Sequence, residues 1–282
     1  MELNYNSARE LQSFLEKENM GMRKKFGQNF LINPNARSKI IDALEAPPGS
    51  DVWEIGPGLG AMTSGLLEKG LQVRAFEIDP GFSRTLRGIF SEYKNFTLVE
   101  GDVMKTWQGQ TAAPYLLGNL PYNIAASLLG GMIEKGRLFN RMVVTVQEEV
   151  AVRMAAGPGS KNYSSFSVLC ACAYSVKKIM DISGDSFYPK PQVNSRALRL
   201  DLKPGAGNYP AVFYPLVRGL FASRRKMIKH NLAHFLSSCG QEGLAGQALS
   251  CSGLSGSERA ENLALDDFLR LAEAIEEERR EG

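Results

Sequence analysis

The four residues Asn119-Leu120-Pro121-Tyr122 place an amide, a stiff turn and an aromatic ring at the end of an apolar segment. Pro121 restricts the backbone, and Tyr122 offers a π-face. A planar base that carries an amine needs acceptors in its plane to orient the amine. It also needs an aromatic ring to replace the stacking lost when the base leaves its helix. The pattern therefore indicates chemistry on a nucleobase, although Asn-x-Pro also makes ordinary turns after strands.

A glycine-rich segment precedes this motif and predicts a nucleotide-like ligand. The apolar run that begins at Asp51 leads into three glycines, Gly56, Gly58 and Gly60, before an expected helix over 61–69. Glycines at such a point let a ligand approach the backbone and the N-terminus of the helix. A second expected strand, 72–76, then ends in Glu77, which could accept hydrogen bonds from both hydroxyls of a ribose.

The spacing of these glycines distinguishes two cofactor classes. A dinucleotide fingerprint requires a third glycine at position 61, where this chain has Ala61. The observed Gly-x-Gly-x-Gly, preceded by Glu54, resembles instead the S-adenosylmethionine loop of class I methyltransferases. A third strand, 96–100, leads to Asp102, whose carboxylate could accept from the amine of the cofactor's adenine. Glycine turns and solvated acids in an ordinary α/β domain are the alternative interpretation.

The order of elements predicts an α/β fold with a parallel, doubly wound sheet. Expected strands alternate with helical stretches and lie near 51–55, 72–77, 96–100, 115–118 and 142–146. Two N-terminal helices are expected over 7–17 and 36–44, and antiparallel strands over 175–182 and 195–202 flank a loop at Phe187. The segment 203–208 has the composition of a linker, and the chain beyond it is helical in pattern.

With these segments aligned, nearly the whole chain resembles the small-subunit ribosomal RNA adenine dimethyltransferases, the KsgA family. The matching motifs are Lys24-Lys-Phe-Gly-Gln-Asn-Phe-Leu31, Glu54-Ile-Gly-Pro-Gly-Leu-Gly60, Glu77-Ile-Asp79, Gly101-Asp102, Asn119-Leu-Pro-Tyr-Asn-Ile124, Val146-Gln-Glu-Glu-Val150 and Phe187-Tyr-Pro-Lys-Pro-Gln-Val-Asn-Ser195. The resemblance implies a Rossmann-like class I methyltransferase domain over 1–205 and a smaller, all-helical RNA-binding domain over 206–282.

The resemblance also implies the residues of the site. Those expected to line the S-adenosylmethionine pocket are Asn29, Leu31, Gly56, Glu77, Asp102 and Asn119. Those expected to hold the target adenine are Asn119, Leu120, Pro121, Tyr122 and Phe187. The implied activity is dimethylation of two adjacent adenosines near the 3′ end of 16S rRNA during assembly of the small ribosomal subunit.

The expected mechanism is in-line attack of the adenine amine on the cofactor's methyl group. The side-chain oxygen of Asn119 and the main-chain carbonyl of Leu120 would each accept one amine hydrogen and favour a pyramidal nitrogen. Tyr122 and Phe187 would stack on the base. A strong base is not required before attack, because the amine proton becomes acidic only after methylation.

Charge is distributed unevenly along a chain whose net charge is +3. The region 202–241 holds six Lys or Arg residues and no acid, whereas 242–282 holds ten acids and four bases. Cations at helical spacing within 220–232 predict a helix that faces phosphate, with a solvated helix face as the alternative. The residues expected to bind RNA are Arg23, Lys24, Lys25, Arg224, Arg225, Lys226 and Lys229.

Composition is that of a globular protein, with 44% hydrophobic and 22% charged residues. Without a basic, hydrophobic start or a long apolar run, the chain is expected in the cytoplasm. Its four cysteines are expected to be buried free thiols. His230 and His234 have the spacing of a helical metal pair but no further ligand nearby, so no metal is expected. The expected partner is small-subunit rRNA within an immature 30S particle, and the expected state is a monomer.

Three other functions fit part of the pattern. Large-subunit rRNA dimethylases of the macrolide-resistance type share the Asn-x-Pro-Tyr pocket, but the C-terminal segments Phe221-Ala-Ser-Arg-Arg-Lys226 and 259–272 resemble the small-subunit enzymes. A mainly non-catalytic ribosome assembly factor would not require Glu77, Asp102 and Asn119 together. An NAD dehydrogenase lacks the required glycine spacing.

Overall fold

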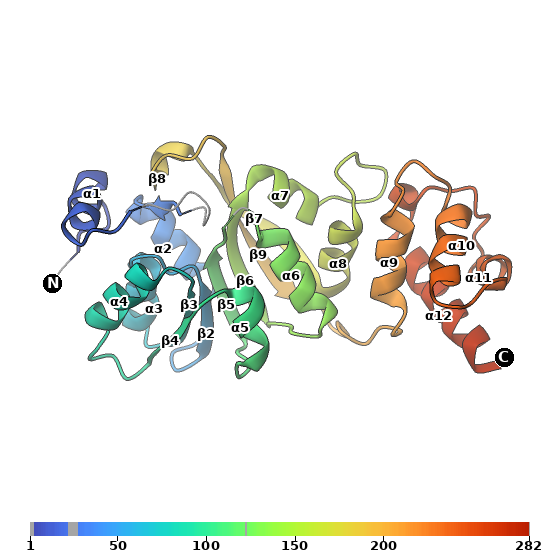
Figure 1. Ribbon diagram of the computed structural model, residues 1–282, viewed down its shortest axis with the longest axis horizontal. Coiled ribbons are helices and arrows are strands. Elements are labelled where there is room, and N and C mark those ends of the chain that lie inside the picture. Colours follow the sequence, from blue (N-terminus) through green and yellow to red (C-terminus); the bar gives the residue numbers. More distant parts are fainter. Residues whose placement is uncertain (1–2, 22–27, 122, 282) are drawn as a thin grey trace. The chain divides into compact units, whose positions relative to one another are not determined.

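The computed structural model describes residues 3–21, 28–121 and 123–281, which form two compact units (Figure 1). Unit 1 comprises Met1–Leu129, Arg137–Ala151 and Val176–Leu202, and unit 2 comprises Gly130–Gly136, Val152–Ser175 and Lys203–Gly282. Arg23, Lys24, Lys25 and Tyr122, four of the predicted site residues, lie outside the described residues. Within the described ranges, every helix is too short or too polar to cross a bilayer.

Unit 1 is built on a seven-stranded sheet with the strand order β4-β3-β2-β5-β6-β9-β7. The strands are β2 (Asp51–Ile55), β3 (Gln72–Glu77), β4 (Phe96–Glu100), β5 (Tyr115–Asn119), β6 (Arg141–Gln147), β7 (Tyr174–Ile182) and β9 (Ser195–Leu202). The first five are parallel, and β9 pairs with β6 in the antiparallel sense. The predicted parallel core and the positions of its strands are thus confirmed.

The helices of unit 1 are α1 (Ala8–Lys17), α2 (Pro34–Asp42), α3 (Ala61–Glu68), α4 (Pro80–Ile89) and α5 (Val103–Thr106); α6 (Ala125–Glu134) and α7 (Glu148–Met154) begin in unit 1 and end in unit 2. Four of these described helices, α1, α2, α4 and α5, begin after a residue whose side chain caps them. Ser7 accepts from the amide of Glu10, and Asn33 accepts from that of Ala36. The Asn33 cap and Pro34 start α2 two residues before the predicted position.

Both faces of the sheet are buried, as expected for parallel strands. On one face Val52, Val73 and Ala75 join a core that includes side chains of α2 and α3. On the other face the Trp53 ring packs against Phe76 and Phe139, with centroid distances of 4.9 and 5.4 Å. Side chains that alternate along β2 and β3 therefore fill the cores on the two faces of the sheet.

A short ribbon pairs segments far apart in the sequence. β1 (Phe30–Leu31) and β8 (Phe187–Tyr188) run antiparallel, with Leu31 opposite Phe187. Phe187 was expected in a loop, but its ring is 3% exposed and packs in the same core as Leu31. The ribbon thus joins the segment before α2 to the segment between β7 and β9.

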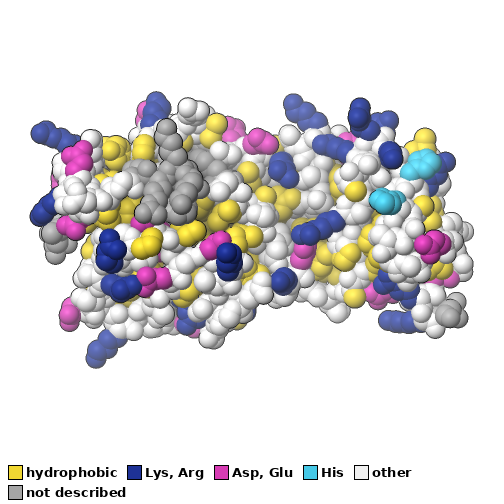
Figure 2. Space-filling view, in the orientation of Figure 1, with side chains coloured by type: hydrophobic (Ala, Val, Ile, Leu, Met, Phe, Trp, Pro, Cys, Tyr) yellow, Lys and Arg dark blue, Asp and Glu magenta, His cyan; other side chains and the backbone are white. Residues whose placement is uncertain are grey.

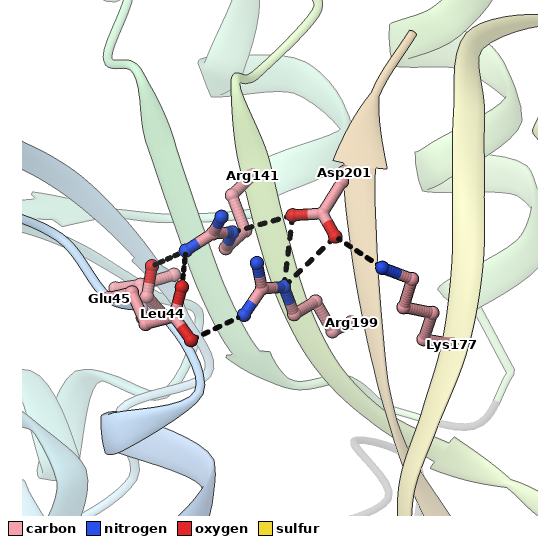
Figure 3. A network of polar contacts seen from close by, with 6 residues as sticks. All are labelled: Leu44, Glu45, Arg141, Lys177, Arg199 and Asp201. Atoms are coloured by element: carbon pink, nitrogen blue, oxygen red, sulfur yellow. Dashed lines mark hydrogen bonds and ion pairs between the residues drawn. The ribbon is translucent and has the colours of Figure 1, made fainter.

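An ion-pair network connects the beginning of β6 to β9 and to the end of α2 (Figure 3). The Asp201 carboxylate accepts from Nε of Arg141 at 2.6 Å and from Nε of Arg199 at 2.9 and 3.0 Å. Glu45 pairs with both arginines at 2.7 Å, and Arg141 also donates to the carbonyl of Leu44. The network lies at the end of β6 opposite to Thr145, which pairs with Asn119.

Unit 2 is helical, as predicted for the chain beyond 203–208. It contains α8 (Ser165–Ala173), α9 (Phe213–Phe221), α10 (Ile228–Ser238), α11 (Leu244–Ser252) and α12 (Leu265–Glu281). The rings of Phe221 and Phe268 stack at 6.0 Å between α9 and α12. A Cβ added at Gly219 would lie 2.9 Å from the Phe235 ring, so the glycine permits close packing of α9 and α10.

The C-terminal part of the chain packs against an earlier segment. Tyr209 donates to the carbonyl of Cys172, Lys203 donates to that of Ala171, and Tyr163 donates to that of Leu263. Residues 152–175, including α8, therefore pack with the C-terminal part. The domain boundary at 205/206 stays a prediction.

Two expectations for unit 2 were wrong. The predicted helix over 220–232 is interrupted, because α9 ends at Phe221, α10 begins at Ile228, and 222–227 forms a turn. Among the cysteines, Cys170 and Cys172 are buried thiols, but Cys239 and Cys251 are exposed.

Candidate active site

A pocket of about 310 Å³ lies at the carboxyl ends of the parallel strands in unit 1. Ligands of open α/β sheets bind at this edge. All six residues predicted for the cofactor border it, namely Asn29, Leu31, Gly56, Glu77, Asp102 and Asn119. The structure therefore brings together side chains from 29 to 119 that the sequence separates.

The glycine loop fits closely against the neighbouring strand. Gly56 has a φ of +73°, and a Cβ there would lie 3.2 Å from the main-chain oxygen of Asn119. A larger residue would be strained and would push Asn119 away from β2. The loop ends at Gly60, whose Cβ would lie 2.6 Å from the Phe90 ring.

Glu77 is buried but keeps acceptor capacity toward the pocket. Its Oε1 accepts from the amide of Asp79 at 2.8 Å, and its Oε2 accepts from the amide of Gly58 at 3.2 Å. Burial raises the pKa of Glu77 to about 7, despite the backbone donors that lower it. Each carboxylate oxygen has a lone pair beyond the bond it already accepts, which suits two hydroxyl donors.

Glu54 is a second buried acid beneath the same loop. Its Oε2 accepts from the Thr63 hydroxyl at 2.7 Å, while Oε1 has no partner among the described residues. Burial raises the pKa of Glu54 to about 7, Thr63 opposes that shift, and the charge of Glu77 adds to it. Two acids below the loop thus titrate near neutral pH.

Asp102 caps the helix that follows β4. Its Oδ1 accepts from the amide of Met104 at 2.9 Å. Asp102, Val103 and Met104 all border the pocket. The Asp102 Oδ2 has no partner among the described residues and could accept from an exocyclic amine.

Asn119 belongs both to the residues predicted for the cofactor and to those predicted for the target base. Its Nδ2 donates to the main-chain oxygen of Asn29 at 2.9 Å. Since a carbonyl oxygen only accepts, the amide must present Nδ2 to Asn29 and leave Oδ1 on the other side. An acceptor of fixed orientation therefore stands at the end of β5.

The motif after Asn119 is braced by β6. The amide of Leu120 donates to the carbonyl of Thr145 at 3.0 Å, and the Leu120 side chain is 1% exposed. Pro121 borders the pocket and accepts from the amides of Ile124 and Ala125 at the start of α6. Leu120 and Phe187 do not border the pocket with their buried side chains.

Sequence reasoning missed one charged residue of the pocket wall. Arg37 projects from α2, borders the pocket and is buried. The signal was available, because Arg37 occupies the face of α2 that also buries Ile40 and Ile41, where a charge is unexpected.

The basic residues of unit 2 differ in their surroundings. Arg225, Lys226 and Lys229 are exposed, whereas Arg224 is half-buried, pairs with Glu261 at 2.5 Å and donates to the carbonyl of Ser160. Lys229 lies in α10, and the turn that carries the other three is held by Asn231, which donates to the carbonyls of Leu220 and Ser223. Figure 2 shows Lys and Arg side chains gathered near the histidines of this unit.

Comparison with known proteins identifies relatives over nearly the whole length. The sequence profile of the family described as "Ribosomal RNA adenine dimethylase" matches residues 19–277. A Treponema denticola protein named "Ribosomal RNA small subunit methyltransferase A" is 47% identical, covering 96% of each chain. A Treponema pallidum protein of the same name is 41% identical, covering 96% of this chain and 97% of the relative.

A solved structure is similar over both units. The crystal structure of a dimethyladenosine transferase from Plasmodium falciparum superposes with a TM-score of 0.75 at 26% identity. It covers 88% of this chain and 97% of that chain.

Proposed function

Because the chain belongs to the ribosomal RNA adenine dimethylase family, we propose that it dimethylates the exocyclic amines of two adjacent adenosines near the 3′ end of 16S rRNA. The family membership confirms the expected class I methyltransferase fold and S-adenosylmethionine as the cofactor. One observation carries the site assignment: the Asn119 amide is fixed at the edge of the cofactor pocket with its oxygen left as an acceptor.

The donor and acceptor set of the pocket fits S-adenosylmethionine. Glu77 would accept from the ribose hydroxyls, and Asp102 would accept from the adenine amine. Gly56 and Leu31 would contact the portion around the sulfur. When bound, the cofactor supplies a methyl carbon made electrophilic by its sulfonium, and the protein supplies position.

The adenine amine would be oriented by two oxygens. Asn119 Oδ1 would accept one amine hydrogen and the main-chain oxygen of Leu120 the other, which favours a pyramidal nitrogen with its lone pair toward the methyl. The Asn29 and Thr145 carbonyls support these groups from behind, through Asn119 Nδ2 and the Leu120 amide. After the first transfer only one hydrogen remains, so the pocket must accept a methyl in place of a proton.

Tyr122 would stack on the target base, whereas burial of Phe187 favours an indirect role. With 3% of its surface exposed, the Phe187 ring packs behind Leu31 across the β1–β8 ribbon. Phe187 would then hold the pocket wall, and contact with the base would require its exposure. The proton released after methylation would leave to solvent.

The RNA would be held mainly by charge. Exposed Arg225, Lys226 and Lys229 would contact phosphate, with Arg224 as a weaker contributor because Glu261 compensates its charge. Arg23, Lys24 and Lys25 would grip the same RNA. We further propose a monomer that acts in the cytoplasm on an immature 30S particle, with catalysis in 1–205 and RNA binding in 206–282.

Mapping of the modified bases tests the function. The purified protein is incubated with S-adenosylmethionine and one of three substrates: immature small subunits that lack the modification, naked small-subunit rRNA, or large subunits. Mass spectrometry of nuclease fragments should find two adjacent dimethyladenosines near the 3′ end of small-subunit rRNA. Dimethyladenosine found only in large-subunit rRNA would contradict the proposal.

A further inference from the structure

Arg37 is a buried cation whose described partners are all neutral. Its side chain is 9% exposed and borders the cofactor pocket. Nη1 donates to the main-chain oxygens of Leu31 at 2.6 Å and Tyr5 at 3.3 Å, and Nη2 donates to Oδ1 of Asn6. In the described part of the chain no carboxylate forms an ion pair with it; the buried Glu54 binds Thr63 instead.

Such a charge is costly to keep. Burial lowers the pKa of Arg37, yet a guanidinium stays protonated in proteins. A buried charge without a counter-ion destabilises a fold, and an apolar side chain of similar volume could fill the position without that cost. The retained charge therefore points to an anion that enters from outside the chain.

The unused hydrogen-bond donors of Arg37 suit a carboxylate. The two Nη1 hydrogens and one Nη2 hydrogen have partners, which leaves the Nε hydrogen and the second Nη2 hydrogen without one in the described residues. Two N–H groups on neighbouring nitrogens of a guanidinium can bind both oxygens of a carboxylate.

The place of Arg37 in the pocket matches one end of the cofactor. Glu77 and Asp102 are assigned to the ribose and the adenine of the cofactor, and Asn119 is assigned to the target amine, which must lie beside the methyl group. Leu31, which is assigned to the portion around the sulfur, accepts from Arg37, so Arg37 lies on the side of the sulfur. Arg37 and Ala61 border this pocket and also a second groove of about 650 Å³. Ala61 is the first residue of α3, whose N-cap Gly60 makes no side-chain cap.

We propose that Arg37 binds the carboxylate of the amino-acid end of S-adenosylmethionine, assisted by the N-terminus of α3. This inference rests on the proposed function, because it assigns one end of the same cofactor. Arg37 would hold the tail while Glu77 holds the ribose. The methyl group between them would then face Asn119 at a constant distance.

Calorimetry with two ligands tests the proposal on the unaltered protein. The ligands are S-adenosylhomocysteine and its decarboxylated counterpart, which differ only in the carboxylate. A charge-assisted contact in a buried site is worth roughly 1.5–3 kcal/mol, so removal of the carboxylate should weaken binding about 10- to 100-fold. Equal affinities would overturn the role of Arg37 and leave the methyltransferase function intact.

Variants assign the preference to Arg37. In Arg37→Gln the two ligands should bind within about threefold of each other, and Arg37→Lys should keep part of the preference. Asn6→Ala is the matched control, since it removes an Arg37 partner but retains the charge, and its preference should stay that of the wild type. An unchanged preference in Arg37→Gln would also overturn the proposal.

A third ligand distinguishes loss of the carboxylate contact in Arg37→Gln from loss of the whole pocket. 5′-Methylthioadenosine lacks the amino-acid end, so its affinity should be the same in wild type and Arg37→Gln. A protein that binds neither this ligand nor S-adenosylhomocysteine would contradict the proposed function itself.

Discussion

Asn119 Nδ2 and the main-chain oxygen of Asn29 form a 2.9 Å hydrogen bond across ninety residues of sequence. The bond fixes which atom of the Asn119 amide faces the substrate. In the proposed mechanism, the position of the Asn119 acceptor would therefore depend on the segment around Phe30 and Leu31, and β1 would support methyl transfer without touching the base.

Replacement of Asn119 should reduce turnover without weakening RNA binding. Asn119→Ala removes one oriented acceptor and should lower single-turnover methyl transfer by roughly 10² or more. Asn119→Asp keeps the shape and an oxygen toward the base, yet it should be similarly impaired, because its second oxygen would face the Asn29 carbonyl. Full activity in Asn119→Asp would contradict this geometry. Filter binding of the rRNA substrate is the control and should remain within about threefold.

Cofactor binding should depend on the ionisation of Glu77. The ribose hydroxyls donate to a carboxylate, whereas the pKa of Glu77 without ligand is raised to about 7. Affinity for 5′-methylthioadenosine should therefore be constant above pH 8 and fall toward about tenfold per unit below pH 7. Titrations between pH 5.5 and 8.5 measure the slope, and Glu77→Gln should bind weakly with no slope. A pH-independent affinity in the wild type would exclude this role for Glu77.

Stability of the ligand-free protein should change with pH in the opposite direction. Glu54 and Glu77 have pKa values of about 7 in the fold and about 4.5 when unfolded, so the folded state binds more protons between these values. The free energy of unfolding should thus rise as pH falls from 8 to 6. Urea unfolding should show this rise, and Glu54→Gln should reduce it. A rise that is the same in wild type and Glu54→Gln would show that Glu54 does not titrate between pH 6 and 8 and would contradict its raised pKa.

Neutralising the exposed cations of the 222–227 turn and of α10 should weaken RNA binding. The triple change of Arg225, Lys226 and Lys229 to Gln should flatten the dependence of log K on log salt by up to about 0.7–0.9 per lost phosphate contact. Lys94→Gln removes one exposed cation of unit 1 and is the control for the loss of a charge outside this surface. Parallel slopes for the wild type and the triple variant would show that this surface does not contact RNA.

Arg224→Gln should behave differently from its neighbours. Because Arg224 pairs with Glu261 and Ser160, its replacement should lower the thermal midpoint of unit 2. Its effect on the salt slope should be smaller than that of Arg225→Gln. A salt slope flattened as much as in Arg225→Gln, with an unchanged melting temperature, would place Arg224 among the phosphate contacts.

Local pattern was sufficient to predict the parallel strands, because each is a short apolar run that ends in a glycine or a polar residue. The same local signals located Glu77, Asp102 and Asn119, and their shared edge followed from strand direction. The β1–β8 ribbon could not be predicted in this way. Its two-residue strands have no periodicity, and they pair only through the tertiary fold.

The turn at 222–227 shows how one side chain can override a periodic pattern. Cations and apolar residues alternate at helical spacing there, but Asn231 donates to the carbonyls of Leu220 and Ser223. These carbonyls at the end of α9 are thereby satisfied, and the chain turns. For Arg37 the sequence offered only its place on the apolar face of α2, and its partners, the carbonyls of Leu31 and Tyr5, are set by the tertiary fold.

The pairing of Leu31 with Phe187 has a consequence for protein synthesis. One wall of the pocket rests on a segment made more than 150 residues later, so a chain emerging from the ribosome cannot complete that wall until β8 has been released. The N-terminal strands can pair earlier, but tight cofactor binding should begin only when β8 has been released and has paired with β1. A partly synthesised chain would therefore neither retain the methyl donor nor modify RNA prematurely.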